Sequence, residues 1–171
     1  IIFLDDDAPV GTSLADYMGD AVFSIDILPN NARNVNVLGI AREVAALTNQ
    51  PLKRIDKKPY ETSGEAIVDK VKVNITNPEL NARFVFGLIR DVEIGPSPYL
   101  VQRRLRLAGI RPISNLVDAT NYAMFEVGEP LHAFDYDVLM ERAKGKPVVI
   151  TTRTAEEGEK LTTLDDIERE L

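Results

Sequence analysis

The stretch GIRPISNLVDATNYAMFEVGEPLHAFD, residues 109–135, decides how the fold of this chain is interpreted. Ser114 precedes a run of apolar residues at helical spacing, and a serine side chain can accept a hydrogen bond from the first helical turn. Gly128 follows the run, as glycine commonly does where a helix ends. The stretch therefore predicts a helix from Ser114 through Met124, followed by a segment that holds His132, the only histidine of the chain.

Two further helices are predicted on the N-terminal side of this stretch. The first is capped by Asn34 or Asn36, and the second begins at Ser97, with Pro98 in its first turn, and ends at Gly109. The apolar residues expected to face inward are Val37, Ile40, Val44 and Leu47 in the first helix and Leu100, Val101, Leu105 and Ala108 in the second.

Strand patterns lie between the predicted helices. Apolar residues alternate over residues 21–27 and 71–75, whereas residues 84–89 form the short apolar run of a more fully buried strand. A strand is also expected at residues 148–150, and residues 161–167 suggest a hairpin. Because strands and helices mix without a regular βαβ rhythm, we predict an α+β fold with mixed sheets and packed helices.

A polar stretch divides these patterns into two units. Residues 49–66 have the composition of a linker, and we place the boundaries at 1–55 for a strand-plus-helix unit, 56–66 for the linker and 67–171 for the second unit. Both ends of the chain fall inside apolar-patterned segments. We therefore expect the chain to belong to a longer protein and the second unit to be truncated at its C-terminus.

The composition is that of an ordinary globular protein, with 44% hydrophobic and 27% charged residues. No stretch approaches the roughly 20 apolar residues that span a bilayer, so no membrane segment is expected. Cysteine is absent and histidine occurs once, which excludes thiolate and multi-histidine metal sites within these 171 residues. A cytoplasmic location fits this composition.

The net charge of −7 argues against sequence-independent binding to nucleic acid. A local exception is the helix of residues 102–111, which carries Arg103, Arg104 and Arg106 and no acidic residue. These arginines are either a solvated helix face or a contact for RNA.

Candidate binding residues come from the stretch that opens this section, and each has a structural alternative. His132 lies among apolar residues and is either a hydrogen-bonded structural residue or a group that pairs a ligand hydroxyl. A site that pairs a hydroxyl rejects the analogue that lacks it. Asn121 could bind a ligand carbonyl or amine or cap a neighbouring backbone group, and Asn115 has the same two readings.

Residues suited to chemical catalysis are not found. The sequence has no glycine-rich phosphate loop, G-x-S-x-G elbow or H-E-x-x-H motif. Asp118, Glu126 and Glu129 are expected to be surface or capping acids. We therefore predict no catalytic side chain in this chain.

Several segments, in the same order, resemble the bacterial phenylalanyl-tRNA synthetase beta chain. The resemblance covers nearly the whole chain, but residues 31–36 depart from the family, which commonly shows an Arg-x-Asp-Cys run there. The segments are DAPVGT at residues 7–12, VLGIAREV at 37–44, the stretch from Ser97-Pro98 to Arg111-Pro112, residues 118–135, and EGEKLTTLD at 157–165.

The resemblance implies that the chain holds the end of a B1 domain and the first part of a B3/B4 editing domain. In this family the editing domain hydrolyses mischarged tyrosyl-tRNA. Asn121 and His132 match positions of the editing pocket, and Asn115 and Phe134 are further candidates. An acidic partner of the histidine is expected beyond Leu171. Without the rest of the pocket, these residues are expected to be inactive on their own.

The resemblance also implies partners. The alpha chain of this family activates phenylalanine with ATP and Mg²⁺, so ligation and both cofactors are expected there and none in this chain. The partners would be tRNA(Phe) and the alpha subunit, in a parent of two alpha and two beta chains. Two other possibilities are a free-standing editing-domain relative, acting as an aminoacyl-tRNA deacylase or RNA-binding protein, and a structural fragment without activity.

Overall fold

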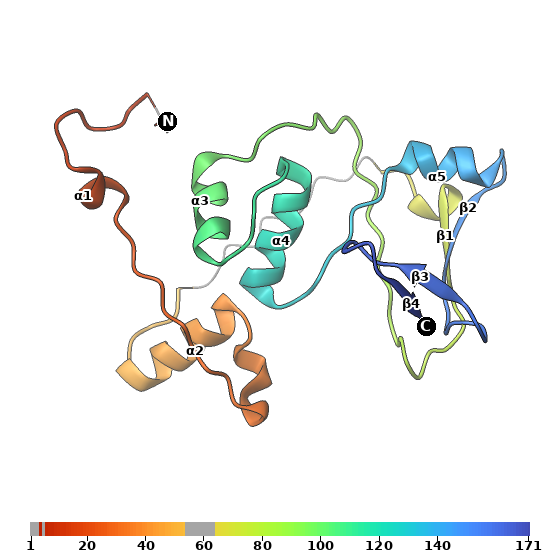
Figure 1. Cartoon of the computed structure of the whole chain (residues 1–171), viewed down its shortest axis with the longest axis horizontal. Coiled ribbons are helices and arrows are strands. Elements are labelled where there is room, and N and C mark those ends of the chain that lie inside the picture. The colour runs from red at the N-terminus through yellow and green to blue at the C-terminus, as the bar shows by residue number, and fades with distance from the viewer. Residues whose placement is uncertain (1–3, 5, 54–63) are drawn as a thin grey trace. The chain divides into compact units, whose positions relative to one another are not determined.

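Helices and short strands are mixed in an α+β arrangement, with most helices preceding the strands β2–β4 at the C-terminal end of the sequence, which confirms the predicted fold class (Figure 1). The computed structural model describes residues 4, 6–53 and 64–171. Its helices are α1 (Leu14–Met18), α2 (Val37–Thr48), α3 (Tyr99–Leu107), α4 (Asn115–Val127), α5 (Tyr136–Ala143) and the 3₁₀ helices η1 (Pro29–Asn34) and η2 (Ile67–Asp69). Its strands are β1 (Val71–Ile75), β2 (Val148–Thr152), β3 (Lys160–Thr162) and β4 (Glu168–Glu170).

Contacts group the described residues into two units, each built from two stretches of the chain. Unit 1 comprises residues within 1–58 and 92–133, and unit 2 comprises residues within 59–91 and 134–171. The predicted linker, 56–66, lies largely outside the described residues. The domain boundaries drawn from the sequence stay a prediction.

Helix α2 of unit 1 begins as its sequence predicts. The Asn36 side chain accepts a hydrogen bond of 2.7 Å from the Gly39 backbone N–H, so Asn36, and not Asn34, is the cap of the two that were predicted. The apolar face expected to be inward is largely exposed instead, with Leu47 at 84% and Val37 at 62%. The buried position is Gly39, because η1 lies so close that a Cβ there would fall 2.2 Å from the Arg33 carbonyl oxygen.

Helix α3 ends as predicted but begins differently. Pro98, not Ser97, is its N-terminal cap residue, and no side chain caps it. At its C-terminus Gly109 takes a left-handed φ of 83°, and the Ile110 N–H donates to the Leu105 carbonyl at 2.8 Å, which satisfies an otherwise unpaired helix-end group. Leu105 is 1% exposed, whereas Leu100 and Ala108 are exposed, contrary to the expectation that they face inward.

Helix α4 packs against both α2 and α3. Ser114 caps it by accepting from the Val117 N–H, as predicted, and the helix continues past Met124 to Val127. Gly128 then takes a φ of 84° and its N–H donates to the Met124 carbonyl at 2.8 Å. A Cβ at Gly128 would lie 2.9 Å from Asn36 Nδ2, so the end of α4 closely approaches the cap of α2.

Unit 2 contains two small sheets. Strands β1 and β2, which confirm two predicted strands, pair in parallel with Val71 opposite Val148. Both of these valines are buried and α5 packs against β2, so the apolar centre of this sheet lies at its N-terminal end. Strands β3 and β4 pair antiparallel and confirm the predicted hairpin.

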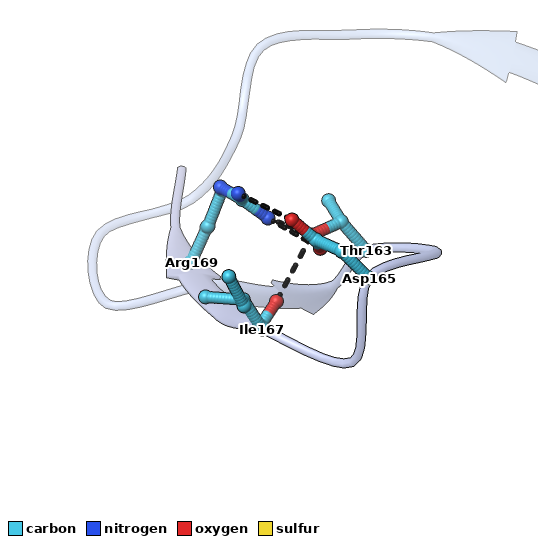
Figure 2. A network of polar contacts seen from close by, with 4 residues as sticks. All are labelled: Thr163, Asp165, Ile167 and Arg169. Atoms are coloured by element: carbon cyan, nitrogen blue, oxygen red, sulfur yellow. Dashed lines mark hydrogen bonds and ion pairs between the residues drawn. The ribbon is translucent and has the colours of Figure 1, made fainter.

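A polar network closes this hairpin, as Figure 2 shows. The Arg169 guanidinium holds both carboxylate oxygens of Asp165, at 2.9 and 2.8 Å, and the Thr163 hydroxyl donates to Asp165 at 2.5 Å. The hydrogen bond from Thr163, followed by that from Arg169, holds the pKa of the Asp165 carboxyl below its ordinary value. Beside it Asp166 takes a φ of 59°, the left-handed conformation that a tight turn requires.

Two predicted strands are absent. Residues 21–27 and 84–89 form no strand and pair with no described strand, and they expose Phe23 at 81% and Ile89 at 73%. Alternation marks a segment that fits a half-buried surface, but a strand also needs a partner for its backbone hydrogen bonds. Among the described residues, β1 pairs only with β2, and β3 pairs only with β4.

Candidate functional site

The centre of unit 1 is a buried carboxylate, Asp118, which is 1% exposed. Its Oδ2 accepts a hydrogen bond of 2.5 Å from the Ser97 hydroxyl, and its Oδ1 accepts one of 2.8 Å from the Ile113 backbone N–H. Of the two expected roles, surface or capping acid, the surface role is therefore wrong for Asp118, whereas its bond to a backbone N–H before α4 is of the capping kind. The pairing with Ser97 could not be predicted locally, because Ser97 lies 21 residues away and serine before a helix ordinarily indicates a cap.

Asn115, one of the candidate pocket residues, binds backbone groups. It is half-buried, its Nδ2 donates to the Glu93 carbonyl at 2.9 Å, and its Oδ1 accepts from the Gly95 N–H at 3.3 Å. The Asn115 N–H also donates to the Gly95 carbonyl at 2.8 Å. Asn115 thus fixes the segment before α3 on the first turn of α4, which is the structural alternative considered for it.

Asn121 and His132, the main candidates, both belong to unit 1. Asn121 is half-buried on α4, and its side-chain amide forms no hydrogen bond with another described residue. His132 is exposed in the segment between α4 and α5. An exposed imidazole and an unengaged amide are both able to bind a ligand. Their sharing of one cavity stays a prediction.

Phe134, proposed as a wall of that cavity, belongs to unit 2 and is 53% exposed. Its ring lies 6.3 Å from that of Phe86, which in turn lies 5.2 Å from that of Phe84, measured between centroids. These tilted contacts at under 7 Å stabilise the aromatic cluster. The contact with Phe86 holds the Phe134 ring within unit 2.

The three arginines of α3 each have another partner within unit 1. Arg103 donates to the Met18 carbonyl and lies 3.3 Å from the Asp20 carboxylate, leaving its side chain 20% exposed. Arg104 donates to the Tyr122 hydroxyl, and Arg106 donates to Gln102 at 2.9 Å. Contact of these arginines with RNA stays a prediction, and it would compete with the hydrogen bonds observed.

A pocket of about 250 Å³ lies beside α3 and α4. Ser97 and Asn115 line it together with Tyr122 and Glu126, whereas Asn121 and His132 do not. The structure therefore brings Asn115 to a hollow that is not lined by the two main candidates. Apolar groups supply the rest of its wall, from Pro98, Val101, Ala119 and Ala123.

Neither a group of metal ligands nor a membrane-spanning helix occurs among residues 4, 6–53 and 64–171. No three side chains of His, Asp or Glu come together there in a way that could hold a metal ion. None of the helices in the described part of the chain combines the length and apolar character that crossing a membrane requires.

The α+β fold and the stretch around α4 agree with a known family. Residues 80–171 match the family model of the B3/4 domain. The chain belongs to the B3/4 domain family.

Relatives similar over the whole chain are phenylalanine–tRNA ligase beta subunits. That of Moorella thermoacetica is 47% identical over 173 aligned residues, which cover 100% of this chain and 21% of the relative. The subunit of Dehalococcoides mccartyi is 42% identical, covering 100% of this chain and 20% of the relative, and that of Bacillus licheniformis is 45% identical, covering 90% and 18%. The chain thus spans about one fifth of the length of these curated relatives.

Proposed function

We propose that this chain is part of a phenylalanine–tRNA ligase beta subunit and takes part in the attachment of phenylalanine to tRNA. The observation that carries the proposal is the similarity to such subunits along the full chain, for example to one that is 47% identical. Residues 1–79 lie outside the B3/4 match and still align with beta subunits. This supports a synthetase subunit over a free-standing deacylase that has only the editing domain.

The finer proposal is that unit 1 contributes to hydrolytic editing of tyrosyl-tRNA. Tyrosine differs from phenylalanine by one hydroxyl, and an imidazole can donate or accept one hydrogen bond with it. His132 is exposed, and the Asn121 amide is not engaged by described residues, so each is accessible to an aminoacyl group. We assign hydroxyl recognition to His132 and positioning of the ester to Asn121, with Asn115 as a supporting residue.

The ligation reaction is assigned to other parts of the ligase. We propose that ATP and Mg²⁺ bind the alpha subunit, that two alpha and two beta chains assemble with tRNA(Phe), and that the complex works in the cytoplasm. The chain alone, at about one fifth of a beta subunit, is not expected to catalyse either reaction.

The test compares wild type with His132→Ala in the complete ligase, alpha and beta subunits together. We expect clearance of tyrosyl-tRNA(Phe) to slow by roughly tenfold or more, because loss of a paired hydroxyl can cost several kcal/mol of discrimination. Attachment of phenylalanine should be nearly unchanged. Glu129→Ala, an exposed change in the same segment, serves as the control. Equal clearance by His132→Ala and wild type would refute the assignment of His132.

A further inference from the structure

A basic pocket lies in unit 2, at the corner where α5 ends and β2 begins. It has a volume of about 500 Å³, within the usual range of ligand pockets. Arg142, Lys144 and Lys146 all line it, and all three are exposed. The remaining wall includes apolar side chains of Leu139, Pro147 and Ile150. The pocket therefore combines three positive charges with an apolar surface.

The backbone around this pocket is fixed by its own turn. The Lys144 N–H donates to the Glu141 carbonyl at 3.1 Å, and the Lys146 N–H donates to the Ala143 carbonyl at 3.0 Å. Lys144 and Gly145 take consecutive left-handed φ values of 52° and 78°. The turn thus holds the backbone of both lysines at the rim of the pocket.

The charges of the pocket are not neutralised within the described part of the chain. Arg142, Lys144 and Lys146 form no ion pair with any described residue. In most of the ion pairs that arginines form elsewhere among the described residues, the guanidinium lies 2.6–2.9 Å from a carboxylate oxygen. One cation in the last turn is enough to complement a helix dipole, whose effect fades within that turn. Three cations at one pocket exceed that need.

We propose that this pocket binds the phosphodiester backbone of RNA, and this inference rests on the proposed function in a tRNA ligase. Clustered Lys and Arg side chains are the groups that bind phosphates, and this pocket provides such a cluster on a chain whose net charge is −7. The pocket is lined by no aromatic side chain on which a base could stack. The contact therefore positions RNA without reading its sequence.

This surface differs from the basic helix singled out in the sequence. The α3 arginines already hold Met18, Asp20, Tyr122 and Gln102, so RNA binding there would break existing contacts. The pocket cations require no such exchange. The pocket cations do not stand out in the sequence, because Glu141 adjoins Arg142 and lowers the net positive charge of the segment. Glu141 itself does not line the pocket.

The test measures binding of labelled tRNA(Phe) to the complete ligase over a series of salt concentrations. The variant Arg142→Gln/Lys144→Gln/Lys146→Gln removes the three charges. The control Arg42→Gln/Lys72→Gln/Arg83→Gln removes three charges from exposed residues that do not line this pocket. A second variant, Arg142→Lys/Lys144→Arg/Lys146→Arg, keeps all three charges.

A plot of log K against log salt concentration has a negative slope, to which each phosphate contact contributes about 0.7–0.9. We expect the slope of the pocket variant to be shallower than that of wild type by roughly 2. At low salt its affinity should fall by roughly tenfold, while the control and the charge-keeping variant behave as wild type. The same drop should occur for RNAs of unrelated sequence.

An unchanged slope in the pocket variant, or an equal drop in the control, would overturn the proposal. Loss of alpha-subunit binding at an unchanged slope would also overturn it, because the pocket would then bind an acidic protein partner. Binding of ATP, and not of RNA, at the pocket would overturn it as well. Aminoacylation and tyrosyl-tRNA clearance by wild type test the proposed function separately. A ligase that fails those assays and still shows the pocket-dependent slope would refute the function and keep the RNA contact.

Discussion

The hydroxyl of Ser97 and the carboxylate of Asp118, 21 residues apart, are joined by a hydrogen bond of 2.5 Å in the interior of unit 1. The other carboxylate oxygen of Asp118 accepts from the Ile113 N–H. One side chain of α4 thereby secures both the segment that leads into α3 and the segment that leads into α4. This three-way attachment makes Asp118 the principal polar anchor that we identify in the unit.

Replacing Asp118 is expected to destabilise the protein more than removing its hydroxyl partner. Asp118→Ala leaves the buried Ser97 hydroxyl and the Ile113 N–H without their acceptor and should lower the free energy of unfolding by about 3 kcal/mol. Ser97→Ala should cost about 1–2 kcal/mol. Urea unfolding measures both, with the exposed Asp26→Ala as control at about 0.5 kcal/mol or less. A loss for Asp118→Ala no larger than that of the control would contradict the anchor role.

The glycines after α3 and α4 provide a matched pair. Gly109 and Gly128 have φ values of 83° and 84°, so alanine at either position incurs the left-handed cost of about 1 kcal/mol. Only at Gly128 would the new Cβ lie 2.9 Å from Asn36 Nδ2, while nothing lies within 4 Å at Gly109. We expect Gly128→Ala to lower stability by roughly 1 kcal/mol more than Gly109→Ala, because Asn36 must move and caps α2. Equal losses in thermal or urea unfolding would show that Asn36 adjusts without cost.

The exposed pair of Arg153 and Glu159 should give a measurable acid dependence. The Arg153 guanidinium donates to both Glu159 oxygens at 2.7 Å, and this bond, with a further one from the Glu156 N–H, lowers the pKa of Glu159 from 4.5 to about 2. A lowered pKa in the folded state means that the stabilisation is complete above about pH 4.5 and is lost as the pH falls toward about 2. The titration can be followed by NMR at the Glu159 side-chain carboxyl. Arg153→Gln should return the midpoint toward 4.5, and an unchanged midpoint would refute the assigned cause.

Local sequence signals predicted the ends of helices well. The caps at Asn36 and Ser114 and the glycines at 109 and 128 were predicted because each depends on groups within a few residues. The parallel partner of β1 could not be derived in this way, because β2 lies beyond α3, α4 and α5 in the sequence. Residues 21–27 illustrate the converse error, since their alternation was present without a described partner strand.

The candidate site was predictable only in part. The sequence pointed to Asn121 and His132 through the stretch they share, and the structure shows both belonging to unit 1. The sequence alone could not show that Asn115 forms hydrogen bonds with the Glu93 and Gly95 backbone, or that Arg103 pairs with Asp20. Those contacts join residues distant in sequence, and side-chain type alone does not reveal whether a polar group is already satisfied.

The end of β2 contains a polar atom that the fold leaves unsatisfied. The Thr152 hydroxyl is buried and has no hydrogen-bond partner among the described residues. Replacing it with a methyl group in Thr152→Val should be neutral or should raise the free energy of unfolding by about 1 kcal/mol, because an unpaired buried hydroxyl carries a desolvation cost. Thr151→Val, at the exposed neighbour, is the control. A stability loss for Thr152→Val greater than that of the control would mean that the hydroxyl makes a favourable contact.

The parallel pairing of β1 with β2 has a consequence for how the chain is made. The Thr76 N–H donates to the carbonyl of Thr152, 76 residues later, so this sheet cannot form until the ribosome has released both strands. At ordinary elongation rates the wait is roughly 4–15 s. During that time the Val71–Ile75 segment emerges with its valines uncovered, and it is then a target for chaperones or for pairing with a neighbouring nascent chain. Slow codons or a pause between the two strands would lengthen this vulnerable interval.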